Sequence, residues 1–257
     1  MLKSLQKAFK VKEVRDRLLY TFMMLVVIRI GCCLPIPGVD PSYLHDFFSN
    51  LQSSGMGFFN AITGGSFSSM SIFALSITPY ITSSIIMQLL TIAIPKLEEM
   101  QKDGEDGRKK IAEYTRYLTV GLALFESCAM AVGLGGKGLL LEDHRNVWGY
   151  LTVVAAMTAG SALLMWIGER ITDNGVGNGI SIVLLINIVS GTPQDMITLY
   201  ERFMAGKSVA VATVACIIVL AIIIAIVVFV LVLNDAERRI PVQYSKKMQG
   251  RRMIGGQ

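Results

Sequence analysis

FFSNLQSSGMGFFNAITGGSFSSMSIFALSITPYITSSIIMQLLTIAIP, residues 47–95, is a run of 49 residues without a charged side chain. One membrane-spanning helix needs roughly 20 apolar residues, so a single ordinary span cannot account for this run. Its first half, 47–69, is rich in Gly, Ser, Asn and Phe, whereas 70–94 is continuously apolar with a stripe of Ser and Thr. The run therefore contains more than one structural element.

The Gly-rich half, 47–69, is a poor lipid-facing helix. Backbone groups in hydrocarbon must be hydrogen-bonded within the protein, so an irregular segment at membrane depth survives only inside protein or beside a water-filled cavity. This half is then typical of a channel or transporter interior. The alternative is a long extracytoplasmic loop followed by one normal helix, and the lack of charge alone does not separate the two.

Composition indicates the class of protein. Hydrophobic residues make up 53% of the 257-residue chain and charged residues 17%, and the mean hydropathy is +0.54. One soluble core could not hide so much apolar surface. We therefore predict an all-α polytopic membrane protein with six spans, over residues 18–34, 70–94, 117–133, 148–167, 176–188 and 209–233.

The distribution of Lys and Arg predicts the orientation. With the N-terminus in the cytoplasm, 19 of the 24 Lys and Arg residues lie on that side and four lie outside, as the positive-inside rule requires. We predict a cytoplasmic arm (1–17), a six-span membrane domain (18–233) and a basic cytoplasmic loop (234–257). The other predicted segments are 96–116 and 168–174 inside, and 38–69, 134–147 and 191–208 outside or facing a pore.

Candidates for covalent chemistry are few. The two histidines both fall on the predicted outer side, and the four cysteines lie in or beside apolar segments without metal or redox spacing. A Gly-x-Gly-x-x-Gly pattern at 133–138 follows a membrane helix rather than a strand, so it does not indicate a nucleotide site. We predict no catalytic residue, no metal site and no cofactor, and therefore no enzyme.

Three intramembrane features suggest function. Arg29 should face protein, water or the outer headgroups, because a cation facing lipid is costly. Glu126 should face the bundle interior, either in a helix–helix hydrogen bond or in a functional role. Ile77 and Ile81 share one helix face with Pro79 between them, which suits a mobile wall beside an opening. Ordinary packing through the neighbouring Ser and Thr residues is the alternative.

Five motif pairs, in order along the chain, resemble the SecY family, the protein-conducting channel of the general secretion system. Taken together in this order and membrane context they are specific, and the similarity covers essentially the whole chain. The pairs are RIG (29–31) with LPIPG (34–38), FALSITPYI (73–81) with IIMQLL (85–90), GRKKI (107–111) with YTRY (114–117), MWIGERIT (165–172) with GNGIS (177–181), and RRIPVQY (238–244) with GRR (250–252).

The resemblance implies a fold. SecY has ten spans in two halves that close like a clamshell around a pore, so this chain is expected to form the N-terminal half, with a re-entrant plug, and to stop in the loop after span six. The resemblance also implies roles for particular residues. These are a plug at 55–69 (Gly57, Ile62, Gly64, Gly65 and Phe67), an apolar pore ring (Ile77, Ile81, Leu184 and Ile188), and a docking surface for the ribosome or SecA (Arg238, Arg239, Lys246, Lys247, Arg251 and Arg252).

The function implied is a channel subunit of the bacterial cytoplasmic membrane that translocates unfolded polypeptides and inserts apolar segments into the lipid. The partners implied are the SecE and SecG subunits, the SecA motor, the ribosome, polypeptides that carry signal peptides, and membrane lipids. Judged without the resemblance, the alternative is half of a secondary transporter with a broken helix at its substrate site.

Overall fold

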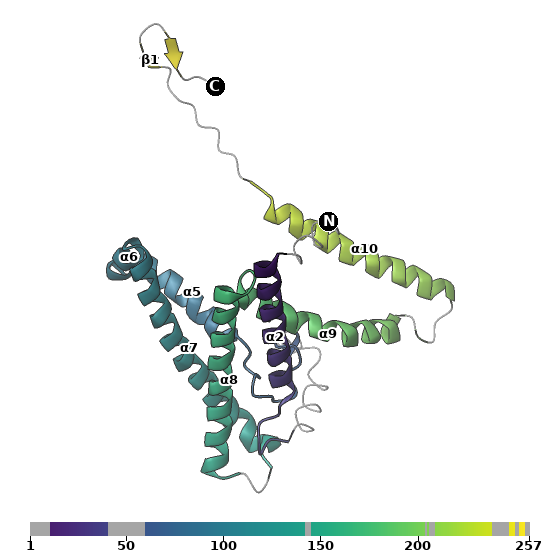
Figure 1. The fold of residues 1–257 in the computed structure, drawn as a ribbon. Helices are drawn as coiled ribbons and strands as arrows, with labels where there is room; N and C mark the ends of the chain where they lie inside the picture. Colours follow the sequence, from purple (N-terminus) through teal and green to yellow (C-terminus); the bar gives the residue numbers. More distant parts are fainter. Residues whose placement is uncertain are drawn as a thin grey trace. The chain divides into compact units, whose positions relative to one another are not determined.

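The computed structural model describes residues 11–40, 60–141, 145–203, 205, 209–237, 247–249 and 252–254. The chain divides into two compact units, Met1–Pro193 and Gln194–Gln257. The elements are α2 (Lys12–Cys33), α5 (Thr78–Ala93), α6 (Pro95–Lys102), α7 (Glu105–Leu134), the π-helical turn η1 (Gly135–Leu139), α8 (Val147–Asn174), α9 (Gly179–Phe203), α10 (Val209–Asn234), β1 (Lys247–Gln249) and β2 (Arg252–Ile254) (Figure 1).

The all-α membrane class is confirmed. Within the described residues four helices, α7 to α10, are long and apolar enough to cross a membrane, and the α5–α6 pair, bent by 101°, would make a fifth. The sequence predicted six spans; α2 covers the first of these but is not among the helices that qualify by length and composition. α9 continues to Phe203, so most of the predicted outer segment 191–208 is helical rather than loop.

α7 and α8 pack along a face of small residues. The buried positions of α7 recur every fourth residue, at Thr115, Thr119, Ala123, Ser127 and Ala131. Small side chains let two helix backbones approach closely, which is the usual basis of helix association in membranes. Two polar contacts also link the helices: the Ser127 and Thr158 hydroxyls lie 3.0 Å apart, and Arg116 Nε donates to Glu169 Oε1 at 2.8 Å.

The predicted second span, 70–94, is only partly helical. Residues 63–77 form turns with one isolated bridge, φ is positive at Met70 (39°) and Ser76 (53°), and α5 begins only at Thr78. Pro79 lies in the first turn of α5, where its missing N–H leaves no intrahelical bond unmade. The prediction that the span starts near Met70 and is interrupted by Pro79 was wrong, because this proline starts the helix.

The turns at 63–77 are enclosed by protein. Thr63, Met70 and Ser71 are fully buried, and the backbone is paired across the fold, since Ile36 N donates to Met70 O and Ile72 N donates to Leu34 O, both at 3.0 Å. This is the condition that irregular backbone must meet at membrane depth. For the described part of the charge-free run, the prediction of a segment inside the protein is therefore confirmed, and the alternative of an exposed loop is wrong.

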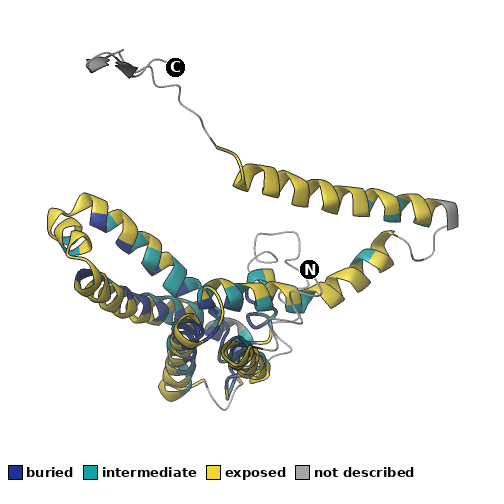
Figure 2. Cartoon of the chain, turned by 45° about the horizontal axis from the view of Figure 1, so that its top comes forward, coloured by how far each residue is buried: buried dark blue, intermediate teal, exposed yellow. Residues whose placement is uncertain are grey.

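The connection between α8 and α9 is fixed to α2. Arg17 Nη1 donates to Gly175 O at 3.3 Å, and Val176 N donates to Thr21 Oγ1 at 3.2 Å. α2 thereby holds the start of α9 near the buried turns. In the other unit, the window of α10 that could cross a membrane has no buried residue and most of the helix is exposed (Figure 2), as expected of a uniformly apolar helix that meets lipid.

Candidate functional site: an apolar wall and an enclosed segment

One apolar cluster joins α2, the buried turns, α8 and α9. Its buried members are Ile28, Cys32, Phe73, Ile77, Leu164, Ile167, Ile171 and Val183, and Ile81 and Leu184 pack against it as partly buried neighbours. Ile77 is fully buried, whereas Ile188 is 51% exposed and lies outside the cluster. The structure thus brings together three of the four predicted ring residues.

Within this cluster the three residues differ in what they can face. A Cβ at Gly168 of α8 would lie 3.5 Å from Ile77 Cδ1, so Ile77 packs against α8 rather than an opening. Ile81 and Leu184 retain exposed surface at the edge of the cluster. Ile77 therefore lies behind Ile81 and Leu184, which form the partly exposed edge of the cluster.

A small polar network lies beside the ring positions. Asn187 of α9 donates through Nδ2 to Ser76 Oγ at 3.1 Å, and Ser161 of α8 donates to the Ser76 carbonyl at 3.4 Å. Asn187 Oδ1 is buried and has no hydrogen-bond partner among the described residues. The sequence analysis missed this network, although an amide inside the apolar run 182–189 was a visible signal.

The described part of the predicted plug, 60–69, contacts both α9 and a second apolar cluster. Gly64 has φ +65°, and a Cβ there would lie 2.8 Å from the Asn187 carbonyl oxygen, so only glycine fits against α9 at this point. Phe67 is buried in a second apolar cluster with Met157 of α8. Ile62 and Gly65 are partly exposed, and Gly57 lies outside the described residues.

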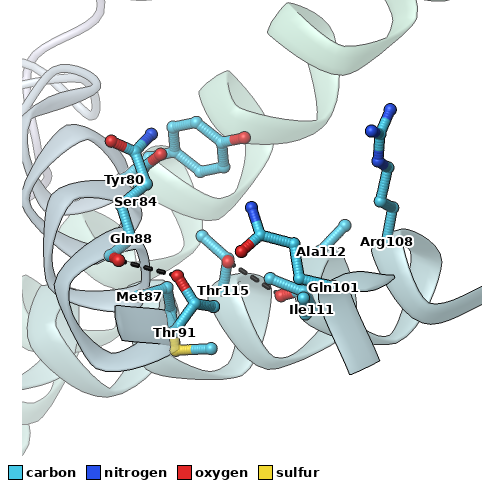
Figure 3. Close-up of a pocket in the computed structure, with 10 residues that line it drawn as sticks. All are labelled: Tyr80, Ser84, Met87, Gln88, Thr91, Gln101, Arg108, Ile111, Ala112 and Thr115. Atoms are coloured by element: carbon cyan, nitrogen blue, oxygen red, sulfur yellow. Dashed lines mark hydrogen bonds between the residues drawn. The ribbon is translucent and has the colours of Figure 1, made fainter. Parts of the chain in front are cut away.

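A pocket of about 310 Å³ opens between α5, α6 and α7. Its polar lining includes Tyr80, Gln88, Gln101 and Arg108 (Figure 3). The Thr91 hydroxyl donates to the Gln88 carbonyl on its own helix at 2.7 Å, so its hydrogen-bond donor is used within α5. The pocket therefore presents amide, phenol and guanidinium groups at this end of the bundle.

The predicted basic docking residues fall mostly outside the described residues, at 238, 239, 246 and 251. Lys247 and Arg252 lie on β1 and β2, an antiparallel pair in which Lys247 faces Ile254 in register and Gln249 faces Arg252. This strand pair was not foreseen from the sequence. In the described part of the chain, no group of three or more His, Cys, Asp or Glu side chains could hold a metal ion.

These features define a polytopic helical membrane protein that encloses an irregular segment beside an apolar wall. The family model of SecY matches residues 71–257. The protein translocase subunit SecY of Streptomyces scabiei is 41% identical over 268 residues, covering 100% of this chain and 60% of the relative. That of Escherichia coli K12 is 40% identical over 250 residues, covering 95% and 55%. This chain belongs to the SecY family.

Two solved structures are similar to the chain. One, titled "The structure of a protein conducting channel", has a TM-score of 0.48 and 19% identity, and the match covers 94% of this chain and 51% of that one. The other, Sec61 in the canine ribosome–channel complex, has a TM-score of 0.48 and 20% identity, with 89% and 49% covered. The chain spans about 60% of the length of the Streptomyces scabiei relative.

Proposed function

We propose that this chain forms the N-terminal half of a protein-conducting channel, which passes unfolded polypeptides across the bacterial cytoplasmic membrane and releases apolar segments into the lipid. The observation that carries the proposal is the enclosed non-helical segment 63–77. Irregular backbone at membrane depth is tolerated only where it is buried in protein or lines a water-filled cavity, and a segment that closes a pore meets this condition. Membership of the SecY family supports the same role, since the relatives above are named protein translocase subunits, and it disfavours the secondary transporter.

The ring residues would act by physical exclusion rather than by covalent chemistry. Ile81 and Leu184 offer branched apolar side chains at the edge of the wall, and a narrow apolar constriction disfavours a continuous file of water. Ions would then pass poorly, while a polypeptide could slide against surfaces that form no hydrogen bonds with it. Energy for transport would come from partners, and the chain itself would be non-catalytic.

The segment 60–69 would serve as the plug of the resting channel. Its described contacts are of a kind that can be broken and remade: Gly64 meets the Asn187 backbone without a side chain, and Phe67 packs in an apolar cluster. Gly64 and Gly65 have φ of +65° and +81°, a conformation that glycine adopts readily, so they can act as hinges.

The partners we propose are SecE, SecG, the SecA motor and the ribosome, with the N-terminus in the cytoplasm. The support is the charge pattern, since six Lys and Arg residues lie within 15 positions at 238–252. Ribosomal RNA presents dense phosphate, so a contact through these residues would weaken steeply with salt. The same charges would also keep the loop on the cytoplasmic side.

Photocrosslinking of a stalled secretory polypeptide tests the channel role. The chain, completed by a separately expressed C-terminal half of a family member, would carry a crosslinking amino acid at position 81 or 184, and at 218 of the exposed α10 as the control. We expect adducts from 81 and 184 but not from 218. Assembled complexes that give no adduct at either wall position would refute the function.

A further inference from the structure

Asn187 of α9 lies where α9 meets two parts of the enclosed segment. Its side chain donates to Ser76 Oγ at 3.1 Å, and its backbone carbonyl oxygen would lie 2.8 Å from a Cβ at Gly64. Asn187 itself is 1% exposed. One buried residue therefore contacts the described part of the proposed plug, through Gly64, and the residue that precedes the supporting Ile77, through Ser76.

The side-chain amide of Asn187 is only half satisfied. Its Oδ1 atom is buried and has no hydrogen-bond partner among the described residues, whereas Nδ2 uses the Ser76 hydroxyl. Turning the amide over would only exchange its two ends, because the single hydroxyl pairs with one end at a time. A buried polar atom without a partner destabilises the state in which it is buried.

The backbone that covers Asn187 belongs to the segment that would move in the proposed function. A Cβ at Gly64 would also lie 3.0 Å from Asn187 Cα and 3.0 Å from Ser190 Oγ, so the segment rests directly on this turn of α9. Departure of residues 60–69 would uncover the turn to the water of an open channel. Water can then donate to Asn187 Oδ1, which completes the hydrogen bonds of the amide.

We infer that Asn187 is a positioning residue that biases the enclosed segment toward release. Its unpaired amide oxygen raises the free energy of the seated segment, and water removes this penalty once the segment has left. The inference deepens the proposed function and rests on it. A segment that is seated too tightly would resist an arriving polypeptide, so a polar group beneath it lowers the work of opening.

Thiol labelling of the full chain in detergent measures how often the segment opens, without any transport. Thr63 is fully buried, so Thr63→Cys, with the four native cysteines replaced by Ala, should react with a water-soluble maleimide only when the segment opens. Where opening and closing are faster than labelling, the labelling rate follows the open population.

Two variants of the hydrogen-bonded pair should change this rate in opposite directions. Ser76→Ala leaves the whole Asn187 amide unpaired and should speed labelling by about fivefold or more, the ratio expected when a buried group loses its partner. Asn187→Leu combined with Ser76→Ala removes every polar group of the pair and should slow labelling below the parent rate by a similar factor. Ordinary packing predicts the reverse, because the double variant would then label at least as fast as Ser76→Ala.

The matched control is Asn174→Leu, which replaces an exposed asparagine at the end of α8 and should leave the labelling rate unchanged. A double variant that labels as fast as the parent would overturn the inference. So would a double variant that unfolds at a lower temperature than the parent, since removal of both partners should be neutral or stabilising. Slower labelling with unchanged ion leak in a completed channel would support the inference and count against 60–69 as the plug.

Discussion

Two glycines of α8 offer a matched test of how tightly the enclosed segment is packed. At Gly160 an added Cβ would collide with the Ile72 carbonyl oxygen and lie 2.8 Å from the Ile72 carbonyl carbon, so backbone must move. At Gly168 the nearest atoms to an added Cβ are 3.4 Å and 3.5 Å away, an ordinary van der Waals distance. Gly160→Ala should therefore strain the segment that Gly168→Ala leaves undisturbed.

The magnitude follows from two terms. Replacing Gly by Ala within a helix gains about 1 kcal/mol of helix propensity, and this gain is common to both variants. Overpacking a well-filled interior costs about 1–3 kcal/mol, and that cost falls on Gly160→Ala alone. The difference in the free energy of unfolding between the variants should thus be about 1–3 kcal/mol, with Gly168→Ala at or above the parent.

The assay is thermal unfolding of both variants in one detergent, followed by the fluorescence of the two tryptophans, 148 and 166, which both lie on α8. We expect Gly160→Ala to unfold at a lower temperature than the parent and Gly168→Ala at the same or a higher temperature. Equal unfolding temperatures for the two variants would refute the reasoning, because the contact between α8 and Ile72 would then not be close enough to matter.

Three further predictions concern the ends of the bundle and the wall. Arg116→Glu should lower the free energy of unfolding by about 0.5–1 kcal/mol, as expected for a partly exposed ion pair, and thermal unfolding measures this loss. Glu169→Arg in the same chain should recover part of the loss; no recovery would mean that the ion pair does not stabilise the fold. Replacing Ile81 and Leu184 together by Ser should raise ion conductance of a completed channel in planar bilayers by wetting the constriction, and parental conductance would count against the ring. Replacing the arginines at 238–239 by Glu should weaken ribosome binding in sedimentation assays while insertion persists, with unchanged binding favouring a purely orientational role.

The long apolar helices could be predicted from the sequence, and the reason is physical. α8 and α10 contain runs that are too hydrophobic for a loop. These helices could therefore be predicted without any knowledge of how they pack. α9 was predicted too short because Pro193 and the polar residues after it resemble a loop, whereas the helix continues through them to Phe203. A proline inside a helix costs one backbone bond but need not end the helix.

The start of α5 could not be predicted, because it depends on tertiary contacts. By composition, 70–77 suits a membrane helix, yet these residues form turns whose backbone pairs with Leu34 and Ile36. No local sequence pattern indicates a hydrogen bond to a segment almost 40 residues away. The same holds for Asn187, whose partner Ser76 is 111 positions distant. The resemblance to a family supplied the roles of the wall residues, but only the structure separates the supporting Ile77 from the exposed edge at Ile81.

The way the enclosed segment is held suits a part that must move. Residues 63–77 are held to the rest of the fold by scattered contacts and not by one continuous set of hydrogen bonds. Some of these are strong, such as the backbone bonds at Met70 and Ile72 near 3.0 Å; others are weak, such as the side-chain-free approach of Gly64 to α9. The strong contacts lie at 70–72 and the weak ones toward 64, so a displacement of the proposed plug would begin near 64 and end before 70–72. Opening of the proposed channel would then leave the apolar cluster behind Ile81 folded.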